Sequence, residues 1–139
     1  TDIAVPDSVQ KLGDFVFSGC AALATATLPN SVTAIGSDTF NGCTSLKKIT
    51  LPSNTNITNR MFYQCSSLEN IVIPDGVKKI GAYAFTGCAA LKNVALSSNI
   101  TYIADNAFNK CGNLKTVYGT TGSYAETWAK NKGYTFAAQ

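Results

Sequence analysis

The sequence predicts a β-rich solenoid of stacked coils, closed at its C-terminal end by a helix and a short strand. Three observations predict it: a repeat of about 23 residues, an apolar pattern within each repeat that ends in strand periodicity, and a different, helical pattern in the last 20 residues. Self-similarity at a fixed period of about 20–50 residues is the signature of a repeat array. Cysteine marks five registers, each three residues after a phenylalanine and three before a leucine, at Cys20, Cys43, Cys65, Cys88 and Cys111.

Each repeat is expected to contribute one strand. Ile49 and Leu51 stand two residues apart, which is strand periodicity, and Pro52 then ends the strand because proline cannot donate to a ladder. The other apolar steps are mostly three residues, which suits tight turns and short 3₁₀ segments. One repeat cannot be stable alone, so the coils must stack with parallel strands ~4.8 Å apart. The expected strands are Ile3–Val5, Thr25–Leu28, Lys48–Leu51, Asn70–Ile73, Asn93–Leu96 and Thr116–Tyr118, with weaker extended segments at Val9–Leu12, Val32–Ile35, Val77–Ile80 and Ile100–Ile103.

The two ends of the array differ. Residues 120–139 predict a cap, because Ser123 and Glu126 form a capping-box pattern and Gly133 suits the position after a helix. Trp128, the only tryptophan, is expected to cover the end of the core rather than to bind a ligand. Residues 1–119 then hold five repeats, with a first strand that begins mid-repeat. No cap precedes Ile3, and an open strand edge tends to pair, so we expect either more sequence upstream or a partner contact through this edge.

The complete repeat resembles a known family. Phe-x-x-Cys-x-x-Leu, preceded by Val-x-x-Ile-Gly and followed by Ile-x-Leu-Pro, is similar to the BspA-like (Treponema pallidum-type) leucine-rich repeats, and residues 31–52 match nearly every marked position. The similarity covers about residues 3–119, and the tail 122–136 resembles the segment that closes such arrays. It implies a right-handed leucine-rich-repeat solenoid in a secreted or cell-surface bacterial protein, associated with adhesion. The scaffold defines this family, so function varies within it.

The composition argues against catalysis and against several partner classes. Histidine is absent, which removes the commonest general base and the commonest metal ligand. The net charge of +3 is mixed along the chain, whereas a nucleic-acid binder would show a basic stripe. No apolar run approaches the ~20 residues that span a bilayer. We therefore predict no enzyme activity, no cofactor, no metal site, no nucleic-acid partner and no membrane span.

The five cysteines are expected to be free, buried thiols. Stacked neighbours would have Cα atoms ~4.8 Å apart, which lies within the disulfide range. Their side chains should nevertheless run parallel, between inward-facing phenylalanine and leucine, where a thiol behaves as a small hydrophobe. A disulfide is the less favoured alternative. A zinc site is less favoured still, because a ladder spreads its ligands along an axis.

Two departures from the repeat stand out. The third repeat is one residue short between Pro52 and Phe62, and its segment Asn54–Met61 holds the only arginine and the only methionine. It is open whether this is a tolerated deletion in a surface turn or a remodelled edge that serves recognition. Glycine precedes the cysteine in three repeats, but Gln64 and Lys110 replace it in the others. This replacement predicts that the position does not need a positive φ and that glycine is only a preference.

The outward strand positions form the candidate contact surface. They align in columns of mostly small residues with a slight excess of lysine and one aromatic anchor, a character that suits an extracellular protein or glycan. A solvated sheet surface without a ligand is the alternative. The two functions left open are a surface-exposed binding or adhesion module and a structural spacer or stalk within a larger surface protein. The candidate contact residues are Thr25, Thr27, Lys48, Thr50, Asn70, Val72, Lys92, Asn93, Thr116 and Tyr118.

Overall fold

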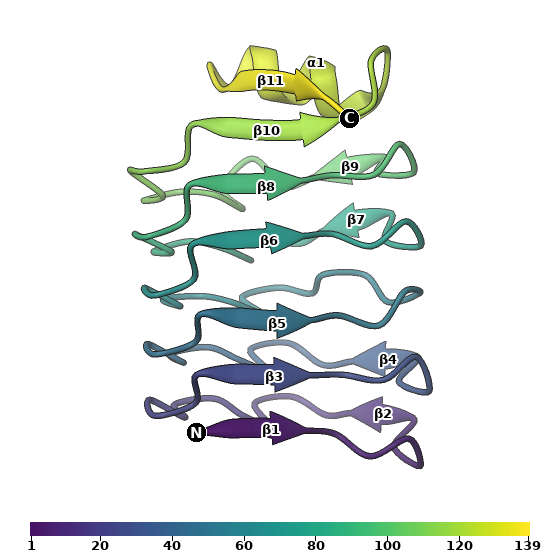
Figure 1. Cartoon of the computed structure of the whole chain (residues 1–139), viewed down its shortest axis with the longest axis vertical. Helices are drawn as coiled ribbons and strands as arrows, with labels where there is room; N and C mark the ends of the chain where they lie inside the picture. Colours follow the sequence, from purple (N-terminus) through teal and green to yellow (C-terminus); the bar gives the residue numbers. More distant parts are fainter.

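Six parallel strands, stacked one above the other, form one face of the solenoid in the computed structural model of residues 1–139 (Figure 1). Each lies within two residues of its predicted position, and each coil rises to the next in a right-handed sense, as the similarity implied. Strand registers are in phase, so that Thr25 pairs with Lys48 and Asn70 with Asn93. The six are β1 (Asp2–Ala4), β3 (Thr25–Thr27), β5 (Lys48–Thr50), β6 (Asn70–Val72), β8 (Asn93–Ala95) and β10 (Thr116–Gly119).

The opposite side of the coils carries shorter strands than the sequence predicted. Four-residue extended segments were expected, and each strand has only two residues, because the first residue of each expected segment still belongs to a turn: the Val32 N–H, for example, donates to the Pro29 carbonyl three residues back. The third coil has no strand here, and Ile57 makes a single bridge to Ile80. These strands are β2 (Lys11–Leu12), β4 (Ala34–Ile35), β7 (Lys79–Ile80) and β9 (Tyr102–Ile103).

Between the two strands, each coil runs through consecutive turns around its cysteine. The Cys43 N–H donates to the Phe40 carbonyl and the Leu46 N–H to the Cys43 carbonyl, both at 3.1 Å. The residue before the cysteine has a positive φ in all five coils, including 62° at Gln64 and 59° at Lys110. The prediction that this position needs no positive φ is therefore wrong. Glycine remains only a preference, since the turn holds two other residues in a conformation that costs them ~1–2 kcal/mol.

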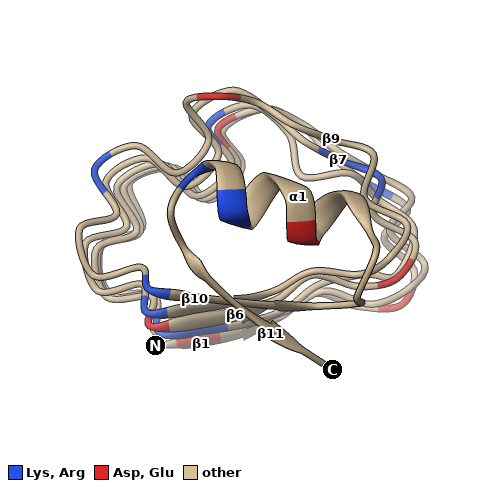
Figure 2. Cartoon of the chain, turned by 90° about the horizontal axis from the view of Figure 1, so that it is seen from above, with Lys and Arg blue, Asp and Glu red and all other residues tan.

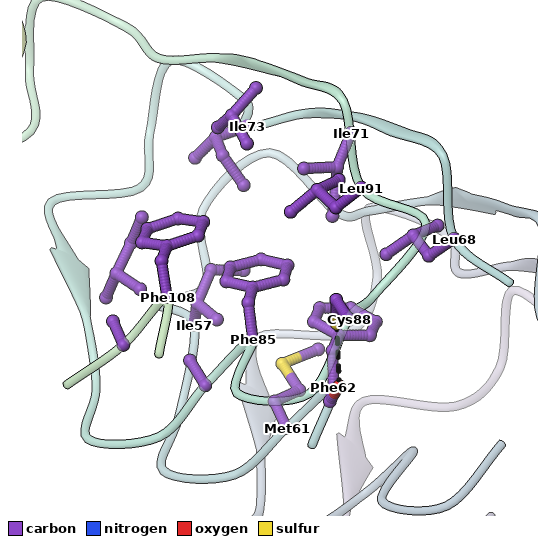
Figure 3. Packing of buried hydrophobic residues seen from close by; sticks show 14 of the residues in the cluster. Ile57, Met61, Phe62, Leu68, Ile71, Ile73, Phe85, Cys88, Leu91 and Phe108 are labelled. Atoms are coloured by element: carbon purple, nitrogen blue, oxygen red, sulfur yellow. Dashed lines mark hydrogen bonds between the residues drawn. The ribbon is translucent and has the colours of Figure 1, made fainter. Parts of the chain in front are cut away.

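The core is built from ladders along the solenoid axis. The phenylalanine rings of successive coils stack at 4.9–5.6 Å between centroids, and Figure 3 shows three of them, Phe62, Phe85 and Phe108, in one row. Beside them, the Cys43 thiol donates to the Phe17 carbonyl of the preceding coil at 3.1 Å, and the next three cysteines repeat this bond. All five thiols are free. Cys20, however, is exposed rather than buried, because it belongs to the first coil, at the end of the stack.

The C-terminal cap covers the open end of this core (Figure 2). Helix α1 (Tyr124–Asn131) begins after Ser123, whose hydroxyl accepts from the Glu126 N–H. The Glu126 carboxylate accepts from the Gly122 N–H rather than from Ser123, so the capping box is shifted by one residue. Trp128 continues the ring ladder, 5.3 Å from Phe108, as predicted for a capping residue. The last strand, β11 (Thr135–Ala138), pairs with β10.

One junction of the solenoid lacks strand pairing. Strands β1, β3 and β5 form one sheet and β6, β8, β10 and β11 another, with no hydrogen bond between β5 and β6. On the opposite side, β4 does not pair with the segment around Ile57 either. Figure 1 shows β5 and β6 further apart than the other neighbouring strands of this face. We call this junction the seam, and it lies where the repeat is one residue short.

Candidate binding surface

The predicted contact residues lie together on the face formed by the six strands and β11. We call this surface the strand face. Thr27 and Thr50 form one column with Ala4, while Val72, Ala95 and Tyr118 continue it beyond the seam. Val72 is 71 % exposed, whereas Tyr118 is half-buried beside Ala137 of β11 and so offers less surface than an exposed anchor would. The structure thus brings the ten residues onto one face but divides them into two groups at the seam.

Polar contacts within the strand face run between neighbouring coils. The Thr25 hydroxyl donates to the Asp2 carboxylate at 2.6 Å, and the Asn93 amide donates to the Asn70 side chain at 2.8 Å. Lys92 pairs with Glu69 at 3.0 Å, with both side chains more than half exposed. An exposed pair of this kind stabilises by only ~0–1 kcal/mol. A partner could therefore replace the Lys92–Glu69 contact at a small cost in free energy.

Lysine residues recur at the N-terminal ends of these strands, where blue segments lie close together in Figure 2. A shallow depression of about 350 Å³ is lined there by Lys92, Asn93, Asn113, Lys115 and Thr116. No carboxylate lies within 4.0 Å of the Lys115 ammonium. This end of the face is polar and positively charged.

A second depression follows the seam. It measures about 340 Å³ and is lined by Lys47, Lys48, Ile49, Asn70, Ile71 and Val72. Ile49 is half-buried here, although Ala26, Ile71 and Val94, which occupy the same inward position in other coils, are buried. The sequence pattern did not predict this depression. The only sign of it in the sequence is the 22-residue spacing of the shortened repeat, and that spacing does not show which strands separate.

The seam is closed on its turn side by an ion pair. Arg60, the only arginine, donates from Nε to Asp38 Oδ1 at 2.9 Å and from Nη2 to Oδ2 at 3.3 Å. The Asp38 side chain is 3 % exposed and also accepts from the Asn41 amide. The hydrogen bond from Arg60 holds the pKa of Asp38 below its ordinary value. Within the segment Asn54–Met61, Met61 is buried and Arg60 is held by Asp38, while Asn54, Asn56 and Asn59 are exposed.

The thiol column offers no reactive group within the core. Burial raises the pKa of Cys43 and Cys111 to about 11, and it raises the pKa of Cys65 and Cys88 further. A thiol of that kind is almost entirely protonated at neutral pH, and the thiolate is the nucleophile. The cysteines of these four coils therefore act as packing groups.

The two ends of the molecule also present surfaces. At the first coil, an apolar depression of about 340 Å³ is lined mainly by Ile3, Phe17, Cys20 and Leu23. At the cap, a depression of about 230 Å³ is lined by Ile103 and Asp105, by four residues of α1 and by the residue that follows it: Tyr124, Thr127, Trp128, Asn131 and Lys132. The only helix, α1, has eight residues, and no helix is long and apolar enough to cross a membrane.

Comparison with solved structures places this architecture among bacterial repeat proteins. A leucine-rich cell surface protein from Faecalibacterium prausnitzii A2-165 is 32% identical, with a TM-score of 0.86, over 92% of this chain and 34% of that one. A leucine-rich repeat protein of T. pallidum is also 32% identical, with a TM-score of 0.80, over 84% of this chain and 57% of that one. The chain thus spans between one third and three fifths of their lengths.

A more distant structure shares the fold alone. The pneumococcal vaccine antigen PcpA is 18% identical, with a TM-score of 0.76, over 99% of this chain and 41% of that one. A comparison with curated proteins finds no match. The profile described as the BspA type leucine-rich repeat region matches residues 1–115 with six copies. The coils, the ring and thiol ladders and this match together establish that the chain belongs to the BspA-type leucine-rich repeat family.

Proposed function

We propose that the chain is a secreted or cell-surface module for protein interaction or adhesion, without catalytic activity, and that the strand face is its contact surface. The carrying observation is that two sheets, β1–β3–β5 and β6–β8–β10–β11, present the ten candidate residues, all exposed or half-buried, on one side of the stack. Repeat arrays use such extended surfaces for binding. The surface location rests on the F. prausnitzii relative, which is described as a cell surface protein.

The partner we propose is an extracellular protein or glycan. The strand face combines small polar side chains, exposed Val72, half-buried Tyr118 and unpaired lysines, a mixture that suits a moderately polar, adaptable interface. Nucleic acid is a poorer fit because the net charge is only +3 and because Glu69 occupies the position that is lysine in neighbouring coils, at Lys47, Lys92 and Lys115. Contact through the apolar end at Ile3 and Phe17 stays a prediction, which a clean monomer by size-exclusion chromatography would contradict.

The test is attachment to arrays of extracellular-matrix proteins, glycans and bacterial surface components. The variant Lys48→Ala/Lys92→Ala/Tyr118→Ala should lose at least tenfold in affinity for the target that the wild-type chain binds. The matched control is Lys11→Ala/Lys79→Ala/Tyr102→Ala, which removes the same residue types from exposed positions on the opposite side. It should bind like the wild type, and urea unfolding should show similar stability for both variants. If the control loses binding and the first variant does not, the strand face is not the contact surface.

The alternative role is a structural spacer or stalk. It is favoured by the low charge and small side chains of the strand face, because most positions offer a partner little contact area and few charged groups. The same arrays decide between the two roles, because a spacer binds none of their components while remaining folded.

A further inference from the structure

The seam leaves two strand edges facing each other without partners. In a parallel sheet, alternate residues direct their backbone groups to opposite neighbours. The Thr50 carbonyl accepts from Leu28 on the β3 side, so the N–H and C=O of Ile49 face β6. The Ile73 N–H donates to Ala95 on the β8 side, so the backbone groups of Val72 face β5. No hydrogen bond joins the two strands.

Unpaired strand edges are templates for another strand. A backbone N–H or C=O that finds no partner is costly when it is removed from water, and an open edge recruits extended segments for that reason. Elsewhere on the strand face every internal strand is paired on both sides. The seam is thus the one place within the sheet where an added strand gains hydrogen bonds on two sides.

The charges around the seam select for an acidic segment. Lys47 and Lys48 line the depression, and no carboxylate lies within 4.0 Å of either ammonium. Glu69, which directly precedes β6, forms an ion pair with Lys92 of the next coil. Val72 and Ile49 supply apolar surface between the lysines and the far end of the strands. A strand that alternates carboxylates with β-branched side chains matches both features.

The contacts at the seam are concentrated on its turn side, so the strands there can separate while that side stays closed. Coils two and three are joined by backbone bonds such as Phe40 N–H to Met61 O, by the Phe40–Phe62 stack and by the Asp38–Arg60 pair. On the strand side, they share no ladder. Admitting a strand needs a β5–β6 separation of about 9.6 Å, twice the normal spacing. That opening breaks no strand hydrogen bond.

We propose that the seam binds an extended, acidic peptide segment of a partner protein, which adds as a strand between β5 and β6. This deepens the proposed function, since it assigns a partner chemistry to one part of the strand face. The peptide pairs with Ile49 on one side and with Asn70 and Val72 on the other, while its carboxylates meet Lys47 and Lys48.

The probe is a fluorescein-labelled heptapeptide of alternating glutamate and valine, tested on the full chain by fluorescence polarisation. We expect saturable binding, together with at least tenfold slower hydrogen exchange of the Ile49 and Val72 amides. The same peptide with alternate backbone nitrogens methylated keeps its charge but can pair along one edge only, so it cannot bridge β5 and β6, and its affinity should fall at least tenfold. Equal binding of the methylated peptide, or of an anionic glycan such as heparin, would overturn strand addition.

The protein variant reverses the charges at the seam. Lys47→Glu/Lys48→Glu should weaken peptide binding at least fivefold, while Lys11→Glu/Lys79→Glu, with the same charge change on the opposite side, stays within twofold of the wild type. Slow exchange of the Ile49 and Val72 amides in the free protein would mean that the seam is already paired, and would refute the proposal.

The outcomes separate this proposal from the proposed function. If the arrays yield a target whose binding depends on Lys92 and Tyr118 but not on Lys47, and the peptide does not bind, then the strand face stands and the seam proposal fails. If the peptide binds as described and the arrays yield no target, the seam proposal stands and the broader contact surface fails.

Discussion

At the scale of single residues, the Asp38–Arg60 ion pair joins two coils at the seam, where the strand hydrogen bonds are missing. The planar guanidinium of Arg60 reaches both oxygens of Asp38, a geometry that lysine cannot reproduce. Both residues have a positive φ, 53° and 58°, so the pair also holds two turns in a strained conformation. The only arginine of the sequence lies in the irregular repeat, and the structure gives the physical reason: its guanidinium binds both oxygens of Asp38 across the seam.

Removing Arg60 should destabilise the chain more than removing an exposed lysine. Arg60→Ala leaves the buried Asp38 carboxylate with Asn41 alone, and we expect a loss of about 1–3 kcal/mol in the free energy of unfolding. Lys92→Ala, which breaks the exposed pair with Glu69, should cost at most about 1 kcal/mol. Urea unfolding measures both. Equal losses for the two variants would show that the Asp38–Arg60 pair has no special role.

The same pair should make stability depend on acid pH. The pKa of Asp38 is lower in the folded protein than the ~3.9 of an unfolded chain. The unfolded state therefore binds more protons between these two pKa values, so that stability falls as the pH falls through the folded pKa. The stability difference between wild type and Asp38→Asn should be constant above about pH 5 and shrink below about pH 4. In an Arg60→Ala background, this decline should be weaker, and an unchanged decline would contradict the assignment.

At the scale of elements, the coil was readable from the sequence because each of its parts has a local cause. The spacing of Ile49, Leu51 and Pro52 predicts where a strand begins and ends, and Ser123 with Gly133 predicts the bounds of the helix. The separation of β5 and β6 was not readable. A 22-residue period shows that a residue is missing, whereas pairing depends on how the shortened coil sits on its neighbour. The ten contact residues followed from strand alternation, but the depression at the seam did not.

The thiol ladder should divide the cysteines into one reactive and four protected groups. Cys20 is exposed, while burial raises the pKa of Cys43 and Cys111 to about 11 and protects the two thiols between them. Under native conditions at pH 8, DTNB should therefore titrate one thiol rapidly. In denaturant it should titrate all five, since none is in a disulfide. A denatured count of three or fewer would overturn the free-thiol assignment, and rapid reaction of several native thiols would contradict the burial.

At the scale of the whole molecule, the seam divides a continuous core into two unequal stacks. The first stack carries β1, β3 and β5, and the second carries β6, β8, β10 and the cap. Stability in a solenoid is nearly the sum of the coils and their interfaces, so a weak interface limits how far unfolding spreads. The capped stack should be the more protected one.

Native-state hydrogen exchange can test this division. Leu23→Ala opens a cavity in the first coil at a cost of about 2–5 kcal/mol. It should accelerate exchange in β3 and β5 by at least tenfold and leave β8 and β10 within twofold of the wild type. Leu91→Ala, the equivalent change in the fourth coil, should accelerate exchange in β6, β8 and β10. Acceleration of every strand by Leu23→Ala would show that the solenoid opens as one unit.

The cap secures one end of the molecule through the shifted capping box, the Trp128 ring and the pairing of β10 with β11. Under a pulling force along the solenoid axis, unfolding would therefore not begin at that end. The seam, which lacks only the strand ladder, bears the load through the Phe40–Phe62 stack, the thiol bond from Cys65 to Phe40, a few turn bonds and one ion pair, and it yields first. A tethered chain would then lengthen in two steps, with the ion pair setting the force of the first. Acid or high salt would lower that force, so the load that the solenoid bears before it opens depends on the pH and the ionic strength of the medium.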